Sequence, residues 1–350
     1  MYKQNLLIFL LAAASGFIFF LLHLPIPWTL GPMALAILWK VAGKKPLSWP
    51  KQVRNAGLVV LGYMLGSPFT PNVAHQVVQL LPVMLTMTLL LIILCLGTGY
   101  LSGRYTGVGL TNSLMGSIPG GLSQMSAICE EIEGINLSAV TLMQTVRVLT
   151  VLSVVPMLAL HGIAGGPAAA GSAVSPMTAD QLPVLALFAL AIMILIKLAK
   201  RLRVSSVYVL APVLGTASLV LAGVKAPVLP APVIAMAQIC VGIRMGQDVD
   251  FGSLSNWKKI AVANFFSVLS VILLLLGIAY VYSHIYPASF VTAFISMAPG
   301  GISEMGLTAM AVDADLPTVV AYQLFRLLFI LLACVPAARW LIRKTCTDRT

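Results

Sequence analysis

The stretch SMAPGGISEMGLTAMAVDADLP, residues 296–317, places a Pro-Gly-Gly triplet in the middle of an otherwise apolar segment. A second copy, GSIPGGLSQMSAICEEIEGINL, occupies residues 116–137, 180 positions earlier, and carries the same triplet. Over the first ten positions of the two copies, five residues are identical. Because self-similarity at a fixed spacing decides an architecture, this motif indicates an internally duplicated chain.

The duplication extends well beyond the Pro-Gly-Gly motif. Prolines, glycines and a Gln-x-x-Arg pattern recur in the same order at offsets of 180 or 179 residues, which argues against a chance resemblance of two apolar stretches. The chain therefore divides into a first repeat, residues 1–180, and a second repeat, residues 181–350, joined by an external linker at 161–180 that is rich in Gly, Ala and Pro. The matched pairs are Pro32 with Pro212, Gly62 with Gly242, Gly66 with Gly246, Gln144 with Gln323 and Arg147 with Arg326.

Composition excludes a soluble globular protein. Hydrophobic residues make up 59% of the chain, charged residues only 9%, and the mean hydropathy is +1.00. Apolar segments long enough to form bilayer-spanning helices recur throughout, so we predict an all-α polytopic membrane protein. The net charge of +11 is then expected to mark cytoplasmic loops rather than a nucleic-acid surface. The segments lie at about 5–22, 27–43, 54–70, 80–102, 107–129 and 136–160, and again at 181–199, 205–223, 228–246, 260–283, 287–311 and 316–339.

Equivalent loops of the two repeats carry opposite charge bias. Residues 40–54 hold five Lys or Arg, whereas the equivalent residues 220–234 hold only Lys225. The connection at 23–27 has none, whereas its duplicate region holds four between Lys197 and Arg203. By the positive-inside rule, equivalent loops lie on opposite sides of the membrane, so the halves are expected to be inverted repeats with both chain ends cytoplasmic.

Inversion requires an odd number of crossings in each half, and six apolar segments are found. We therefore expect five transmembrane helices plus one re-entrant hairpin per half, with the reversal at Pro-Gly-Gly, where glycine frees the backbone and proline removes a helical donor. Two alternatives stay open, namely twelve full crossings and a Pro-Gly-Gly segment that crosses the membrane as a broken helix.

Paired interrupted segments in two inverted halves are the best sequence pointer to a transporter site. Irregular backbone at membrane depth persists only where protein buries it or where it lines a cavity, and a helix starting after Gly-Gly offers free N–H groups to an anion. A kinked spanning helix is the structural alternative. The candidate substrate-binding residues around the two tips are Ser117, Pro119, Gly120, Gly121, Ser123, Gln124, Pro299, Gly300, Gly301 and Ser303.

Three charged residues at membrane depth have two interpretations each. Arg147 and Arg326 lie about ten residues inside their segments, where they attract a substrate carboxylate or serve as structural partners for Glu304 or for hairpin carbonyls. Gln144 and Gln323, one turn earlier, orient the arginines or line the cavity. Glu304, which replaces the neutral Gln124 of the first half, is either an ion-coupling carboxylate or a buried partner of Arg326.

Catalytic and DNA-binding functions are not expected. The four histidines (His23, His75, His161 and His284) lie singly in predicted external loops, without HxxxH or HxxE spacing, and the five cysteines form no CxxC. We therefore expect neither an enzyme nor a cofactor or metal site. A DNA-binding regulator would need a soluble domain, and the longest predicted cytoplasmic loops are only about 15 residues long.

The duplicated Pro-Gly-Gly signature, followed by Ser-Gln-Met or Ser-Glu-Met and then by Gln-x-x-Arg, resembles the AbrB family of bacterial membrane proteins over the whole chain. Members are labelled as ammonia monooxygenases or as regulators of gene expression. The family is similar to the cation:proton antiporter and anion transporter folds, which implies inverted repeats and an elevator-like cycle. The resemblance implies no particular substrate and no particular site residues.

Together these features predict a secondary transporter of a small anionic solute in the bacterial inner membrane, with proton or cation coupling. The alternative is a membrane-embedded regulator that acts indirectly on gene expression through a partner or a sensed solute. The expected partners are the lipid bilayer, a small-molecule substrate and, at most, a second copy of the chain, but no nucleic acid.

Overall fold

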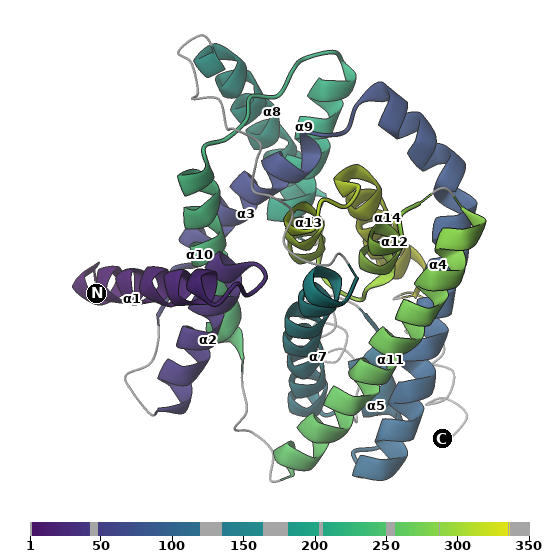
Figure 1. Ribbon diagram of the computed structural model, residues 1–350. Coiled ribbons are helices and arrows are strands. Elements are labelled where there is room, and N and C mark those ends of the chain that lie inside the picture. The colour runs from purple at the N-terminus through teal and green to yellow at the C-terminus, as the bar shows by residue number, and fades with distance from the viewer. Residues whose placement is uncertain are drawn as a thin grey trace. The chain divides into compact units, whose positions relative to one another are not determined.

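The computed structural model describes residues 2–42, 48–119, 135–163, 181–202, 206–249, 256–286, 288–334 and 336. These residues form α-helices, with two short π-helical segments and no strand among them (Figure 1). The prediction of an all-α chain with long apolar helices is therefore confirmed.

The chain folds into two compact units, and each of them combines pieces of both sequence halves. Unit 1 comprises Met1–Gln79, Pro156–Val249 and Ile302–Val320. Unit 2 comprises Leu80–Val155, Asp250–Gly301 and Ala321–Thr350. The two repeats are thus a division of the sequence, and the compact units cut across that division.

Unit 1 consists of two matched sets of three helices and one shorter helix. The first set contains α1 (Tyr2–Leu21), α2 (Pro27–Val41) and α3 (Lys51–Gly66), and the second contains α8 (Leu182–Arg201), α9 (Val207–Leu221) and α10 (Ala231–Asp248). The shorter helix is α13 (Ile302–Ala311), which packs on α3. Helix α2 starts at Pro27, whose fixed φ suits the first helical position and whose missing N–H costs nothing there.

Helix pairs in unit 1 approach closely at Gly-x-x-x-Gly patterns. Each pair joins a helix of one repeat to a helix of the other, and the two pairs make equivalent contacts. A Cβ added at Gly66 of α3 would lie 2.5 Å from the backbone oxygen of Val213 in α9. A Cβ at the equivalent Gly246 of α10 would lie 2.5 Å from the oxygen of Met33 in α2, and residues 33 and 213 are themselves 180 positions apart. Small residues let helix backbones pack this closely within membranes. The duplication is therefore repeated in the tertiary contacts of unit 1.

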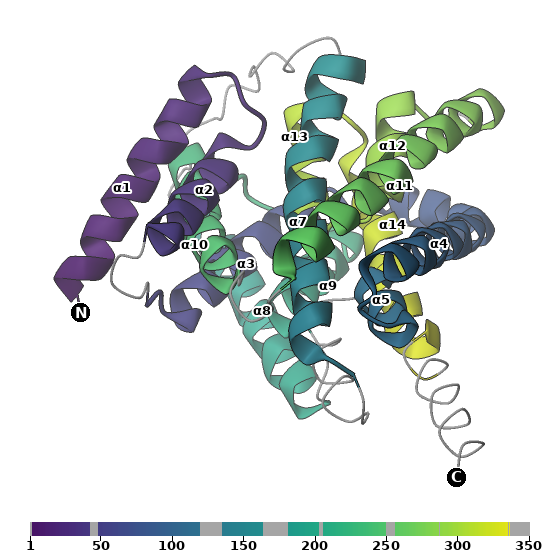
Figure 2. The same ribbon diagram turned by 90° about the horizontal axis from the view of Figure 1, so that it is seen from below.

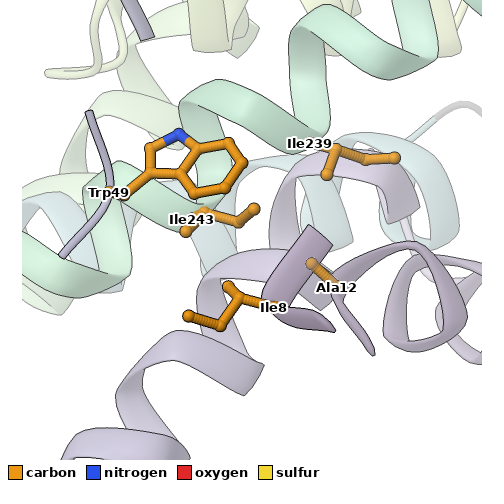
Figure 3. Packing of buried hydrophobic residues seen from close by; sticks show 5 residues of the cluster. All are labelled: Ile8, Ala12, Trp49, Ile239 and Ile243. Atoms are coloured by element: carbon orange, nitrogen blue, oxygen red, sulfur yellow. The ribbon is translucent and has the colours of Figure 1, made fainter. Parts of the chain in front are cut away.

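A tryptophan in the connection before α3 joins α1 to α10. In Figure 3 the Trp49 indole lies among Ile8 of α1 and Ile243 of α10, with Ala12 and Ile239 completing the cluster. The indole Nε1 donates to the backbone oxygen of Cys240 at 3.1 Å, and the Trp49 backbone N donates to Gln247 Oε1 at 3.1 Å. Apolar packing and satisfied polar atoms together hold this connection on α10.

Unit 2 contains the helices that surround the Pro-Gly-Gly segments. They are most of α4 (Pro71–Thr106), α5 (Leu110–Ser117), most of α7 (Leu137–Met157), α11 (Trp257–Ile285), α12 (Phe290–Met297) and most of α14 (Leu316–Phe329). The π-helical segment Leu158–Ile163 continues α7, and Ile330–Cys334 continues α14. Helix α11 crosses α7 (Figure 2), where Ile260 packs on Leu142, Met143 and Val146.

Five helical stretches are long and apolar enough, by length and composition, to cross a membrane. They are Pro71–Thr106, Leu137–Gly162, Leu182–Arg201, Trp257–Ile285 and Leu316–Cys334. Ten crossings were expected, and helices α2, α3 and α9 have only 15, 16 and 15 residues. At 1.5 Å per residue each is about 22–24 Å long, against a hydrocarbon core of about 30 Å.

The predicted external loop that holds His75, between the apolar segments 54–70 and 80–102, is helical from Pro71 onward, which corrects the sequence-based boundary. Helix α4 begins at Pro71, so His75 lies in a helix rather than in a loop. His161 likewise lies in the π-helical segment Leu158–Ile163, and His284 lies within α11. The polar first turns of α4 follow a proline at the first helical position, which favours a helix start even where the residues are not apolar. Hydropathy detects only the apolar part of such a helix.

Helical structure stops at the Pro-Gly-Gly motif, as predicted. In the second half, α12 ends at Met297, the residues up to Gly301 are not helical, and α13 begins at Ile302. In the first half, α5 ends at Ser117, directly before Ile118 and Pro119. Helices α5 and α12 have eight residues each, about 12 Å, which is less than half of the hydrocarbon core.

Candidate functional site

The end of α12 leaves backbone carbonyls without helical partners, and Gln323 of α14 satisfies several of them. Its Nε2 donates to the backbone oxygens of Ile295 at 3.1 Å, Ser296 at 3.3 Å and Ala298 at 3.2 Å. The last carbonyls of any helix lack intrahelical donors, and a buried carbonyl without a donor is costly. Gln323, itself buried, therefore caps the helix that leads into the second Pro-Gly-Gly segment.

Arg326 completes this cap one turn further along α14. Its Nη1 donates to the oxygen of Ala298 at 2.6 Å, and its Nη2 donates to the oxygen of Gly300 at 2.5 Å and also to Gln323 Oε1. A planar guanidinium can hold two carbonyls of one turn at once. It also places a positive charge at the negative end of the α12 dipole.

The first half has the same arrangement at the matching positions. Gln144 Nε2 donates to the oxygens of Met115 at 3.3 Å and Ile118 at 3.0 Å, and Arg147 Nη1 donates to Ile118 at 2.6 Å. Met115 and Ile118 correspond to Ile295 and Ala298 at the 180-residue offset. Of the interpretations left open by the sequence, the structure shows the arginines bonding carbonyls at the helix interruptions. Attraction of a substrate carboxylate stays a prediction.

These contacts do not neutralise the charge of Arg326. Its hydrogen-bond acceptors are uncharged oxygens, and the residues of unit 2 that the structure describes include no Asp or Glu. Arg147 and Arg326 are each only 6% exposed and lie within electrostatic range of one another and of the Cys95 thiol. Burying an ionic group is expensive unless an opposite charge compensates it. Among the described residues of unit 2, no acidic side chain therefore compensates the buried charge of Arg326.

A small cavity adjoins the interruptions within unit 2. It has room for about one water molecule, about 10 Å³. Helix α4 contributes Cys95 and Thr98, α11 contributes Asn264 and Ser267, and Asn264 Nδ2 also donates to the oxygen of Met143 at 2.7 Å. The remaining lining residues are Gly116, Ser117, Arg147, Val268, Val271 and Pro299.

Close packing of α5 on α4 places Ser117 at this cavity. A Cβ added at Gly99 of α4 would collide with the Ser117 side chain, so only glycine leaves room for the serine. The Ser117 hydroxyl donates to the oxygen of Ser113 at 2.8 Å. Residues with hydroxyl, amide and guanidinium groups therefore line this small cavity together with apolar residues, next to the two Pro-Gly-Gly segments.

The structure brings together only some of the predicted site residues. Ser117, Arg147 and Pro299 line the cavity, whereas Gln144, Gln323, Arg326 and Gly300 belong to the caps just described. Pro119 follows the end of α5, and Gly301 is exposed in the connection before α13. The predicted residues Gly120, Gly121, Ser123 and Gln124 lie outside the described residues.

Ser303 and Glu304 belong to α13 in unit 1. Glu304 is half-buried in the first turn, and its carboxylate accepts hydrogen bonds from the Ser303 hydroxyl and from its own backbone N–H. Arg54 of α3 lies within electrostatic range of that carboxylate. An acidic side chain in the first turn favours the start of a helix, so Glu304 stabilises the N-terminus of α13.

Sequence reasoning missed the contributions of α4 and α11. A signal was present, because Thr98 and Asn264 are polar residues within long apolar helices, where an amide or hydroxyl needs a partner. Nothing in the local sequence shows, however, that these two helices approach the Pro-Gly-Gly segments. In the described part of the chain, no group of three or more His, Cys, Asp or Glu residues is placed to hold a metal ion.

Comparison with known proteins identifies one matching family and two similar proteins. Residues 28–342 match the family described as "Transition state regulatory protein AbrB". The chain is 27% identical over 351 residues to "Uncharacterized protein YhjN" of Bacillus subtilis, covering 95% of this chain and 91% of that protein. It is 25% identical over 323 residues to "Putative regulator AbrB" of Escherichia coli, covering 92% of each chain. The chain therefore belongs to the AbrB family, as its motifs indicated.

Proposed function

We propose that this protein is a secondary transporter that moves a small anionic solute across the bacterial inner membrane. One observation carries the proposal: buried Arg326 bonds only uncharged oxygens at a helix interruption, in a unit whose described residues include no acidic side chain. A small cavity, whose lining includes Ser117, Arg147 and Asn264, adjoins the interruptions within unit 2. Interrupted helices whose backbone groups line a cavity are characteristic of transporter substrate sites.

Contacts between distant segments support the inverted topology with cytoplasmic chain ends. In that topology residues 40 and 249 both lie on the cytoplasmic side. In a topology with twelve full crossings they would lie on opposite sides of the membrane. Lys40 Nζ donates to the oxygen of Val249 at 2.5 Å. Tyr63 Oη likewise donates to the oxygen of Pro227 at 2.6 Å, and inversion places both residues towards the outside. Each pair lies within unit 1, and both pairs favour five crossings per half.

Chain crossings between the units support an elevator-like cycle. The chain leaves unit 1 at Gln79, close to Pro82 within α4, and it returns at Pro156 within α7. It crosses at three further points, after Val249, after Gly301 and after Val320. Proline and glycine are where helices bend and where backbones absorb rotation. In the proposed cycle unit 2 carries the substrate and unit 1, in a monomer or homodimer, stays fixed in the membrane.

A ligand screen tests the anion specificity. Purified protein in detergent is heated with chloride, phosphate, acetate, citrate or glutamate, and with matched neutral and cationic solutes. A ligand that binds only the folded state raises the unfolding midpoint, by about 2.7 kcal/mol of stability at 100 times its dissociation constant. We expect one anion to do so and Arg326→Gln to weaken that shift. Stabilisation only by cations would contradict the proposal.

The same anion then tests coupling in reconstituted vesicles. We propose that Glu304 takes up and releases a proton during each cycle, since burial disfavours its charge while Arg54 and the start of α13 favour it. With an imposed pH gradient, wild-type protein should accumulate the anion. The Glu304→Gln variant, which copies Gln124 of the first half, should only exchange it. Proton-driven accumulation by Glu304→Gln would leave Glu304 a helix-capping residue.

A regulatory role is the second candidate, favoured by the name "Putative regulator AbrB" of the Escherichia coli relative. In that case binding of a solute, rather than its movement, would be the biological output. The vesicle assay separates the two functions, because a pure sensor binds the stabilising anion but neither exchanges nor accumulates it.

A further inference from the structure

One end of unit 2 presents three cationic side chains interleaved with three aromatic rings. The C-terminal turns of α4 carry Tyr100, Arg104 and Tyr105, and the first turn of α11 carries Trp257, Lys258 and Lys259. These six residues are called the basic-aromatic end below. Although α4 and α11 come from different repeats, Lys259 Nζ lies 5.1 Å from the centre of the Tyr105 ring. The two helix ends therefore form one surface.

Cation–ring contacts recur within each helix end. The Arg104 guanidinium lies 5.3 Å from the centre of the Tyr100 ring, and Lys258 Nζ lies 5.8 Å from the centre of the Trp257 ring. A cation within about 6 Å of an aromatic ring is attracted by the ring quadrupole. These contacts hold the cationic groups near the rings without neutralising their charge.

A buried cluster fixes the position of this surface. Trp257 and Val108 pack against Leu142, Met143 and Val146 of α7, together with Ile260. The side chains of Arg104, Lys258 and Lys259 are nevertheless exposed, and Tyr105 is 69% exposed. Packing against α7 thus fixes the backbone of the basic-aromatic end, while its cationic side chains and Tyr105 remain accessible.

The chemistry of this surface matches a membrane interface on the anionic side. Aromatic rings favour the headgroup level of a bilayer, and juxtamembrane Lys and Arg attract anionic lipids. Among the residues of unit 2 that the structure describes, no Asp or Glu offsets these three charges. Both helices are also apolar and long enough to cross a membrane, so their ends reach its surface.

We propose that the basic-aromatic end binds the phosphate headgroup of an anionic phospholipid such as phosphatidylglycerol. Arg104, Lys258 and Lys259 pair with the phosphate, and the rings of Tyr105 and Trp257 pack beside the glycerol and upper acyl region. Because the site joins the end of α4 to the start of α11, the bound lipid clamps the two repeats together within unit 2. This site is separate from the cavity and does not depend on transport.

The test uses the full chain purified in a neutral detergent. Phosphatidylglycerol or phosphatidylcholine is added in mixed micelles, and bound lipid and the unfolding midpoint are measured by native mass spectrometry and a thermal ramp. Wild-type protein should retain phosphatidylglycerol selectively and melt later with it. Since each surface charge is worth about 1 kcal/mol, or about fivefold in affinity, an Arg104→Gln, Lys258→Gln, Lys259→Gln triple variant should bind roughly 100-fold more weakly.

A matched triple variant removes three charges elsewhere. Lys197→Gln, Lys200→Gln, Arg201→Gln, at the end of α8 in unit 1, should bind phosphatidylglycerol at least ten times more tightly than the first triple variant. Equal loss in both would show a general effect of net charge and overturn the site. Should the first triple variant fail to fold, Lys259→Gln alone is expected to weaken binding about fivefold, and unchanged binding contradicts the proposal.

A third experiment distinguishes binding of a lipid from binding of a free anion. Inorganic phosphate and glycerol 3-phosphate are added at the same concentrations without lipid. If either raises the unfolding midpoint as much as phosphatidylglycerol does, the end binds soluble phosphate and the lipid proposal is wrong. If neither does, the acyl region is part of the recognition, as proposed.

Discussion

At the scale of single residues, the Gln-x-x-Arg pattern is a capping device as well as a candidate ligand site. In both halves the glutamine and arginine bond carbonyls where a helix stops. Water cannot satisfy those carbonyls in a bilayer core, so side chains must do so. The same guanidinium groups carry charge into a buried region, which a purely structural cap would not need. Structural and functional interpretations of these arginines are therefore compatible.

The capping role predicts the behaviour of Gln323→Met. Methionine keeps the length of the side chain but cannot donate to the oxygens of Ile295, Ser296 and Ala298. A buried acceptor left unsatisfied costs about 1–3 kcal/mol, so we expect this variant to unfold at a clearly lower temperature in detergent. The exposed Thr86→Ala, whose hydroxyl bonds within its own helix, is the control and should melt like wild type. A wild-type midpoint for Gln323→Met would show that the amide does not stabilise the interruption.

At the scale of helices, close backbone contacts at glycine hold α3 on α9 and α10 on α2 in unit 1. Gly62 and Gly66 of α3 meet α9, and Gly242 and Gly246 of α10 meet α2. Helices in a membrane gain no hydrophobic stabilisation from one another, because lipid is as apolar as leucine. Surfaces of small residues compensate by allowing many van der Waals contacts at short range.

Because Gly66 and Gly246 make equivalent helix contacts, we expect alanine substitutions at the two positions to reduce stability equally. Gly66→Ala would place a Cβ 2.5 Å from the Val213 oxygen, and Gly246→Ala would place one 2.5 Å from the Met33 oxygen. Backbone cannot yield as a side-chain tip can, so each variant should lose about 1–3 kcal/mol of stability, measured by thermal unfolding. Gly277→Ala in α11 has no atom within 4 Å of the new Cβ and should be neutral or slightly stabilising. A large loss in only one of the two variants would contradict equivalent packing.

At the scale of the whole molecule, topology is the property on which the transport proposal depends. Cysteine-accessibility labelling in intact cells, on a cysteine-free background, should place Lys45→Cys and Lys259→Cys on the cytoplasmic side. His75→Cys and Gly171→Cys should react from outside. The positive-inside bias is the physical reason for this expectation. Cytoplasmic labelling of residue 171 would exclude inverted halves and with them the proposed cycle.

Local chemistry made a large part of this architecture predictable from the sequence. Long apolar runs can bury their backbone polar groups in a bilayer only as helices, so the all-helical class follows from composition. The interruption at Pro299-Gly300-Gly301 follows from the missing proline donor and the free glycine backbone, and both act within a few residues. The duplication is a property of the sequence itself, and it pairs Gln144 with Gln323 before any contact is known.

Only the tertiary structure decided which segments share a compact unit and which side chains meet the interruptions. Thr98 and Asn264 come from helices whose sequences favour a membrane but specify no neighbour, and their positions depend on contacts between residues far apart in the chain. The partners of Arg147 and Arg326 were undecided for the same reason, because a buried guanidinium can donate to a carboxylate or to a carbonyl. Helix type is encoded locally, whereas the composition of a site is set by long-range packing that no single segment contains.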